Sequence, residues 1–128
     1  MRYYINKTIT APFDLAVEKV TEALKKEGFG VLSEIDIQQK LKEKLDVDFR
    51  KYKILGACNP PSAYKALQME DKIGTMLPCN VILQEKGETQ VEVAAIDPVA
   101  SMIALENMGV AEIAGDIKEK LERVIDSL

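Results

Sequence analysis

The chain has 128 residues, with 17 lysines and arginines against 21 aspartates and glutamates, which gives a formal net charge of −4 at pH 7. This length is enough for a single domain, residues 1–128, whose core needs neither disulfide bonds nor a structural metal. The acidic balance and the lack of a basic tail argue against a nucleic-acid partner. Histidine is absent, which excludes Ser-His and Cys-His catalysis and imidazole metal sites.

The sequence also predicts a protein without a membrane partner. No segment approaches the roughly 18 uninterrupted apolar residues that a membrane span needs. The first residues, Met1 to Lys7, alternate like a strand and lack the apolar run of a signal peptide. We therefore expect a cytoplasmic location, where cysteine thiols are usually reduced.

The first half of the chain alternates between strand and helix patterns. A proline near the start of each long helical pattern and a glycine after the first one mark the helix ends. The predicted elements are a strand over 2–9, a helix from Pro12 to about Glu27, a strand over 29–37, a short charged helix over 38–45, a strand over 52–57 and a helix from Pro61 to about Glu70.

The second half predicts a β-hairpin with strands over 79–85 and 89–96. Its odd-numbered apolar residues must share one face, so the loop needs an odd number of residues, and Lys86-Gly87-Glu88 fits. This register places Cys79 opposite Ala95. A helical turn through residues 100–103 and an amphipathic helix after Gly109 complete the chain.

Because strands outnumber helical crossovers, the pattern indicates an α+β fold: an antiparallel sheet of about five strands with the long first and last helices on one face. The apolar spacing also predicts which side chains form the core. They are Val17, Val20, Leu24, Val31, Ile54, Val81, Leu83, Val91, Val93, Ile113, Ile117, Leu121 and Val124.

The only two cysteines lie in turn-rich segments, Gly56-Ala57-Cys58-Asn59-Pro60-Pro61-Ser62 and Leu77-Pro78-Cys79-Asn80-Val81. If the strand ending at Ala57 runs antiparallel to the strand starting at Cys79, both thiols and Asp97 lie at one end of the sheet. We expect Asn59 to cap the helix that follows it. The alternative is that both cysteines are small apolar core residues, a common role of free cysteine.

These segments, together with Ala95-Ile96-Asp97-Pro98, resemble the signature of the domain of unknown function family 302, and the similarity covers nearly the whole chain. The resemblance implies an α+β domain with a TATA-binding-protein-like architecture. It implies no activity, because the family has none established. Its motif positions mark candidate site residues without roles: Lys44, Cys58, Asn59, Pro60, Cys79, Asn80 and Asp97.

Three kinds of site fit these residues. A small polar or anionic ligand could bind the backbone amides of Ser62, Ala63 and Tyr64 at the helix N-terminus, aided by Lys44. A soft metal could bind Cys58 and Cys79, as Cu(I) between two thiolates or as Zn(II) with Asp97 and water. In a thiol enzyme, Cys58 would be the nucleophile, with Lys44 or Asp97 carrying the proton.

Ligand or metal binding is favoured over a purely structural or partner-binding domain, and an enzyme ranks last because the usual histidine activation is missing. A homodimer is a further expectation. The apolar run Met102, Ile103, Leu105 and Met108 exceeds what one domain needs to cover its own sheet, although burial beneath the last helix also explains it.

Overall fold

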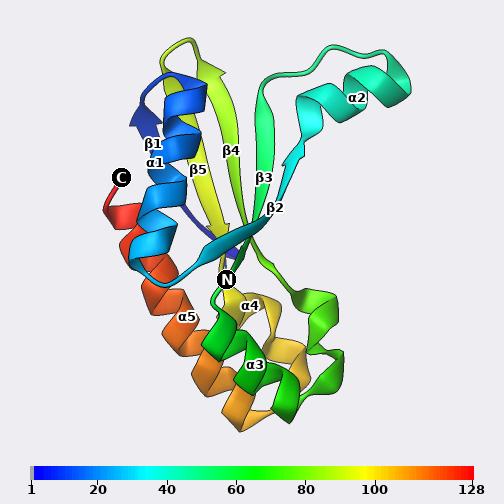
Figure 1. Cartoon of the computed structure of the whole chain (residues 1–128), viewed down its shortest axis with the longest axis vertical. Coiled ribbons are helices and arrows are strands. Elements are labelled where there is room, and N and C mark those ends of the chain that lie inside the picture. The colour runs from blue at the N-terminus through cyan, green and yellow to red at the C-terminus, as the bar shows by residue number, and fades with distance from the viewer. Residues whose placement is uncertain (1) are drawn as a thin grey trace.

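A computed structural model describes residues 2–128 as an α+β fold with one five-stranded antiparallel sheet, in the order β1-β5-β4-β3-β2 (Figure 1). The predicted fold class is confirmed. The strands are β1 (Tyr4–Thr10), β2 (Gly30–Asp36), β3 (Tyr52–Cys58), β4 (Cys79–Gly87) and β5 (Gln90–Ile96). The helices are α1 (Phe13–Lys26), α2 (Ile37–Leu45), α3 (Pro60–Met69), α4 (Pro98–Ser101) and α5 (Met108–Asp126), with short 3₁₀ helices η1 (Asp71–Met76) and η2 (Ile103–Leu105).

Helices α1 and α5 pack on the same face of the sheet, as their apolar stripes predict (Figure 1). We call this the covered face and the opposite side the open face. Nine of the predicted core side chains are buried, and Val17, Val31 and Ile113 pack against them partly exposed. The nine are Val20, Leu24, Val81, Leu83, Val91, Val93, Ile117, Leu121 and Val124.

Ile54 is the one wrong core assignment. Its neighbour Leu55 is 1% exposed on the covered face. Ile54 pairs with Ile82, and Ile82 pairs with Ala94, all on the open face. Because successive strand residues point to opposite faces, an error of one position reverses the assignment. The continuous apolar pair Ile54-Leu55 gives no alternation from which to choose.

The hairpin register also differs from the prediction. Val81 pairs with Ala95 and Leu83 with Val93, so odd residues share the covered face as expected. The connection is a two-residue turn, Glu88-Thr89, with a β-bulge between Glu85 and Gly87. The bulge adds one extra residue to β4, which keeps the odd-numbered residues of both strands on one face. The predicted three-residue loop would have had the same effect. Cys79 is therefore not opposite Ala95.

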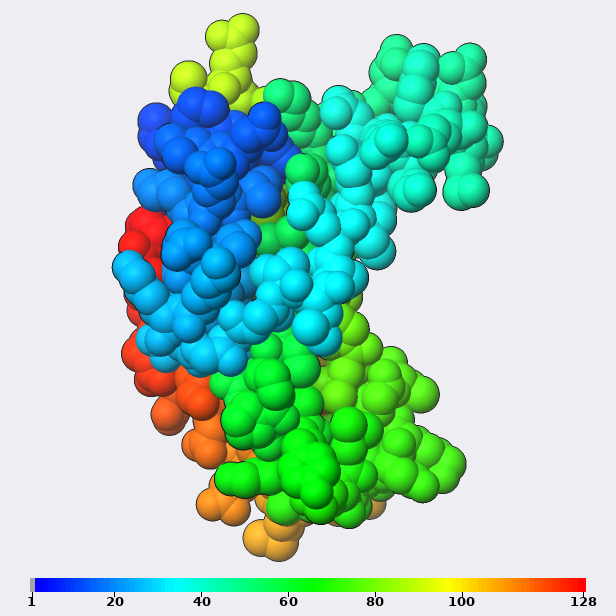
Figure 2. Space-filling view, in the orientation of Figure 1, coloured from blue at the N-terminus to red at the C-terminus, as the bar shows by residue number. Residues whose placement is uncertain are grey.

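Two projections lie at opposite ends of the sheet. Helix α2 extends outward beyond the ends of β2 and β3, whereas α3, η1, α4 and the start of α5 form a helical cap at the other end (Figure 1). A broad concavity separates the two in the space-filling view (Figure 2). Within residues 2–128, every helix is too short or too polar to cross a bilayer.

Candidate functional site

The strand order brings the two cysteines together. β3 and β4 are antiparallel neighbours, and Ala57 pairs with Cys79, so Cys58 is next to the residue opposite Cys79. The site predicted from the sequence requires this antiparallel pairing of β3 and β4, because only then do both thiols lie at the same end of the sheet. Pro78 packs close to Gly56, where an added Cβ would lie 2.7 Å from Pro78 Cγ. Glycine is thus required for the chain to enter β4 at this point.

Both cysteines line a cavity of about 40 Å³ between the end of the sheet and the helical cap. We call it the thiol pocket. Its remaining walls are mainly apolar and include Phe29, Ile73, Met102 and Ile117. Sites for organic ligands usually measure roughly 300–1,000 Å³, and one water molecule occupies about 30 Å³ in the liquid. The pocket as it stands therefore has room for an ion or a water molecule.

The two thiols have different environments. Cys79 is 8% exposed, whereas Cys58 is intermediate, and neither forms a disulfide. Burial, and to a smaller extent the charge of the neighbouring Cys58, raises the pKa of the Cys79 thiol from 9.0 to about 11. Two thiolates side by side in an apolar pocket repel one another, so double ionisation needs a compensating cation.

Asn59 caps α3 as predicted, and the cap occupies backbone amides that the expected anion site would use. Its Oδ1 accepts from the Ser62 amide at 3.3 Å, and its backbone carbonyl accepts from the Ala63 amide at 2.9 Å. Pro60 and Pro61 have no amide hydrogen to offer. The amides of Ser62 and Ala63 are therefore already bonded, and an anion at this helix end stays a prediction that would have to compete with these bonds.

The Asn59 side chain also connects α3 to the end of α1. Its Nδ2 lies 3.3 Å from the carbonyl oxygen of Gly28, which has a φ of 84°. A positive φ is readily adopted by glycine, and an added Cβ at Gly28 would come within 3.0 Å of this Nδ2. Asn59 thus has a structural role that holds the pocket wall in place.

Asp97 is engaged by α4 and α5. Its Oδ1 accepts from the amides of Val99 and Ala100, and its Oδ2 lies 3.1 Å from Lys118 Nζ. Among residues 2–128, no three His, Cys, Asp or Glu side chains are grouped to hold a metal ion. The expected zinc site of Cys58, Cys79 and Asp97 is therefore not formed.

The remaining site residues lie elsewhere. Lys44 belongs to α2, at the opposite end of the sheet from α3 (Figure 1), so it cannot assist an anion or carry a proton at Cys58. Asn80 pairs with Gly56 and lines a hollow of the open face. The thiol enzyme consequently loses Lys44 as a proton carrier, and Asp97 is already paired with Lys118.

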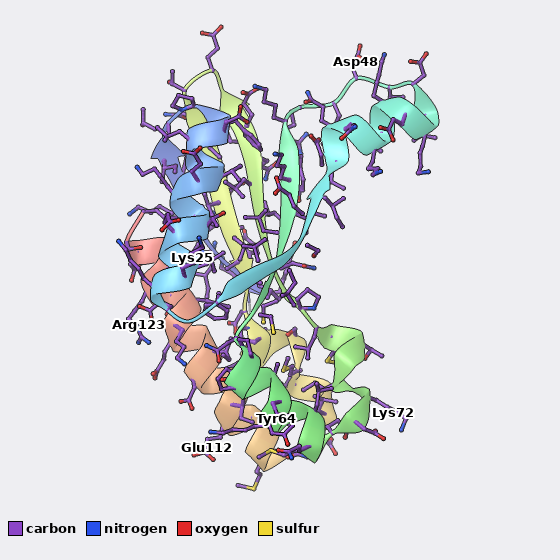
Figure 3. The ribbon with its side chains drawn as sticks, viewed as in Figure 1. Lys25, Asp48, Tyr64, Lys72, Glu112 and Arg123 are labelled. Carbon is purple, nitrogen blue, oxygen red and sulfur yellow. The ribbon has the colours of Figure 1, made fainter. Side chains whose placement is uncertain are left out.

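The apolar run that suggested a dimer is divided between two environments. Met102 and Leu105 pack against a small core in the helical cap, whereas Ile103 and Met108 are 66% and 89% exposed. Tyr64 also lies on the outer side of α3, away from the sheet (Figure 3). A homodimer through this surface remains an expectation.

Sequence reasoning missed the apolar walls of the thiol pocket. Phe29 follows α1, Ile73 lies in η1 and Val110 lies in the first turn of α5, so they come from distant parts of the chain. The helical stripe that includes Ile113 and Ile117 was the one available signal. It predicted burial, but not that these side chains face the cysteines.

The comparisons with known proteins agree with the motifs. The family model described as "Domain of unknown function DUF302" matches residues 5–128. A solved structure titled "Crystal structure of uncharacterized conserved protein DUF302 from Bacillus stearothermophilus" has a TM-score of 0.90 and 28% sequence identity, and 98% of each chain is covered. The comparison with curated proteins gave no match. The chain therefore belongs to the DUF302 family.

Proposed function

We propose that this domain binds one soft monovalent cation, Cu(I), between Cys58 and Cys79. The observation that carries the proposal is that both thiols of the chain line one apolar cavity of about 40 Å³. This volume suits an ion and is several times smaller than a typical organic-ligand site. Thiolate sulfur is a soft donor that selects Cu(I).

The number of donors favours Cu(I) over zinc. Structural zinc almost always has four ligands, and no group of three acidic, cysteine or histidine ligands occurs in the described part of the chain. Cu(I) accepts two thiolates in a linear arrangement. A cation at this position would also stabilise the Cys79 thiolate, whose pKa is raised mainly by burial and also by the charge of Cys58. Binding would release thiol protons, so affinity should increase with pH.

The test is an anaerobic titration of the reduced protein with Cu(I) in competition with a chromogenic Cu(I) chelator. We expect one Cu(I) per chain, and we expect Cys58→Ser and Cys79→Ser each to lower the affinity by at least about a hundredfold. Asp97→Asn is the matched control, because asparagine can still cap α4 and Asp97 is not a proposed ligand. Titration with Zn(II) should give much weaker binding.

Two results would contradict the proposal. One is a Cu(I) affinity that is unchanged when either cysteine is replaced. The other is an equal loss in Asp97→Asn, which would indicate that binding follows the general integrity of the cap. Circular dichroism of each variant separates loss of a ligand from loss of folding.

A further inference from the structure

Within residues 2–128, no helix covers the open face of the sheet. Both long helices, α1 and α5, pack on the covered face, and α2 and the helical cap extend beyond opposite ends of the sheet (Figure 1). The open face contains a hollow of about 360 Å³, lined by strand residues and by Tyr3, which precedes β1. Because none of these residues belongs to a helix, the described chain does not fill this hollow itself.

The strand register places an apolar row across the middle of this face. Ile35 pairs with Ile54, and Ile54 pairs with Ile82. Ile82 pairs in turn with Ala94, so four neighbouring strands contribute one apolar side chain each. An antiparallel sheet usually presents polar residues on its solvent side. An apolar row on the uncovered side is instead typical of a face that meets another surface.

Charged side chains are nearly absent from the open face, although they make up 30% of the chain. Of the strand residues that the register pairs on this face, Glu92 is the only charged one. Tyr4 and Tyr52 line the hollow, and the guanidinium groups of Arg2 and Arg50 lie 4.6 Å and 5.8 Å from their ring centroids. Depletion of charge, with tyrosine and arginine enriched, is typical of the core of a protein–protein interface.

The polar groups of this face are bonded to one another. Glu92 Oε2 accepts from Asn6 Nδ2 at 2.9 Å, and Glu92 Oε1 accepts from Gln84 Nε2 at 2.7 Å. Arg2 donates to Asn6 at 2.6 Å, and Arg50 donates to Gln84 at 2.9 Å. Covering a polar group is costly mainly when the group is left without a partner. This face can therefore be covered by a second protein surface without leaving these groups unpaired.

The area of the face matches what a stable pair of protein surfaces needs. The sheet has five strands, and four of them have seven residues. A strand spacing of about 4.8 Å and a rise of about 3.3 Å per residue give a face of roughly 550 Å². Two such faces in contact would bury about 1,100 Å², which exceeds the roughly 1,000 Å² expected of a specific interface.

We propose that the open face is the interface of a homodimer, in which the sheets of two copies meet face to face about a two-fold axis. A second copy brings a face of the same size with the same lack of charge, so one contact covers both. The apolar rows then bury each other, as the inner faces of a β-sandwich do. Tyr3, 67% exposed at the rim of the hollow, is the large side chain available to enter the partner's hollow.

The charges of the face favour a second copy over nucleic acid or an anionic membrane. Those partners require clusters of basic residues, whereas Arg2 and Arg50 are the only arginines at this rim and both already have partners. The interface also differs from the surface of the helical cap that the apolar run near Met108 suggested. The two surfaces can therefore be tested against each other.

The first test is sedimentation velocity of the reduced protein at pH 7, from about 1 μM to about 1 mM. We expect a reversible monomer–dimer equilibrium with a Kd in the micromolar range, because the area is at the low end for specific interfaces. Since apolar contact carries the association, added salt should not weaken it. A protein that stays monomeric at about 1 mM, or a dimer that dissociates in salt, would overturn the proposal.

Variants then assign the contact to one surface. Ile35→Lys places a charge at the end of the apolar row, where the side chain is 41% exposed in the monomer, and should weaken dimerisation at least about tenfold. Tyr3→Ser should weaken it as well. Met108→Lys is the matched control, because Met108 is 89% exposed on the helical cap, and it should leave the dimer unchanged. The opposite pattern, with loss only in Met108→Lys, would overturn the proposal. Circular dichroism checks that each variant is folded.

NMR of ¹⁵N-labelled protein gives an independent reading of the same surface. On dilution, we expect amide shifts in β3, β4 and β5, whereas shifts confined to α2 or to the helical cap would contradict the proposal. Cys58 and Cys79 line the thiol pocket and not the open-face hollow. Cys58→Ser and Cys79→Ser should therefore dimerise normally, and Ile35→Lys should still bind Cu(I), so each proposal can fail without the other.

Discussion

Strand β4 contributes to both faces of the sheet, and the two sets of side chains differ in kind. Val81 and Leu83 are fully buried on the covered face under α1 and α5. Asn80, Ile82 and Gln84 alternate with them on the open face and line a hollow. Burial of aliphatic side chains on one face supplies the stability of the fold. The open face can therefore present polar and aromatic side chains that the stability of the fold does not require.

The largest expected effect is on the free energy of unfolding, and it should differ between substitutions at two neighbouring residues of β4. Leu83→Ala should lower the free energy of unfolding by about 2–5 kcal/mol, because it leaves a cavity in the packed core. Ile82→Ala, one position away on the open face, should cost about 1 kcal/mol, because this side chain is only partly removed from water. Urea denaturation of dilute, monomeric protein measures both. Equal losses would show that the open face is covered even in the monomer.

The second prediction uses pH to test the burial of Cys79. Its thiol has an ordinary pKa of 9.0 and a folded-state pKa of about 11. Between these values the unfolded chain loses the thiol proton while the folded chain keeps it. The contribution of Cys79 to the free energy of unfolding is therefore complete below pH 9.0 and is lost as the pH rises towards 11. We expect a loss of about 2 kcal/mol over this range, since one pKa unit corresponds to roughly 1.4 kcal/mol.

The control for that measurement is Cys79→Ala. This variant should lose stability less steeply between pH 9 and pH 10.5 than the wild-type chain, although lysines and tyrosines titrate in both. Identical slopes would mean that Cys79 is solvated and that the thiol pocket is open.

The third prediction concerns alkylation of the two thiols at neutral pH. A pKa raised from 9.0 to about 11 lowers the thiolate fraction of Cys79 at neutral pH about a hundredfold. A thiolate with a higher pKa is a stronger nucleophile, but this offsets only part of the loss in reaction rate. Cys58 should therefore react with iodoacetamide at least about tenfold faster than Cys79. The single variants Cys58→Ser and Cys79→Ser measure each rate separately. Equal, slow labelling would make both cysteines packing residues.

The fourth prediction compares the caps of two helices at opposite ends of the sheet. Asn59→Ala should cost about 1–2 kcal/mol, because it removes the α3 cap and the bond to Gly28 O. Asp36 caps α2 through the Gln39 amide, but no residue of α2 is buried. Asp36→Ala should therefore affect the global unfolding transition less. The reverse order would show that α2 packs against a partner.

The sequence predicted most of the fold because its strands and helices have consistent periodicity and clear ends. The stripes of α1 and α5 determined the covered face, and the cap at Asn59 followed from the prolines after it. The antiparallel contact of β3 and β4, which brings Cys58 near Cys79, could be stated as a condition before it was observed.

The site itself was less predictable, for reasons visible in single residues. Lys44 was linked to Cys58 because both match a family motif. Positions in a sequence motif do not say how far apart the residues lie in the structure. The Ser62 amide was assigned to a ligand although the predicted Asn59 cap also uses such an amide, and in the structure Asn59 Oδ1 accepts from Ser62. The open-face hollow depends on cross-strand neighbours such as Glu92 and Asn6, 86 positions apart. No local pattern reports such a contact.

The smallest expected effect tests whether the open face has an organised polar network. The pKa of the Glu92 carboxyl group is lowered from 4.5, first by the Asn6 hydrogen bond and also by Gln84 and Lys86. A lowered folded-state pKa adds stability above the unfolded value of 4.5, and this contribution is lost as the pH falls through the lower folded value. The wild-type chain should thus exceed Glu92→Gln in stability at pH 7, and the difference should shrink at lower pH.

Urea midpoints at pH 7, pH 5 and pH 3 provide the measurement, with Glu88→Gln as the control that removes an exposed carboxylate. Because the Glu92 side chain is still partly exposed, the effect should be much smaller than that of Leu83→Ala and should decrease in added salt. A constant difference between wild type and Glu92→Gln at all three pH values would indicate that the carboxylate is not held by Asn6 and Gln84. The open face would then lack the fixed negative charge that distinguishes it from the covered face.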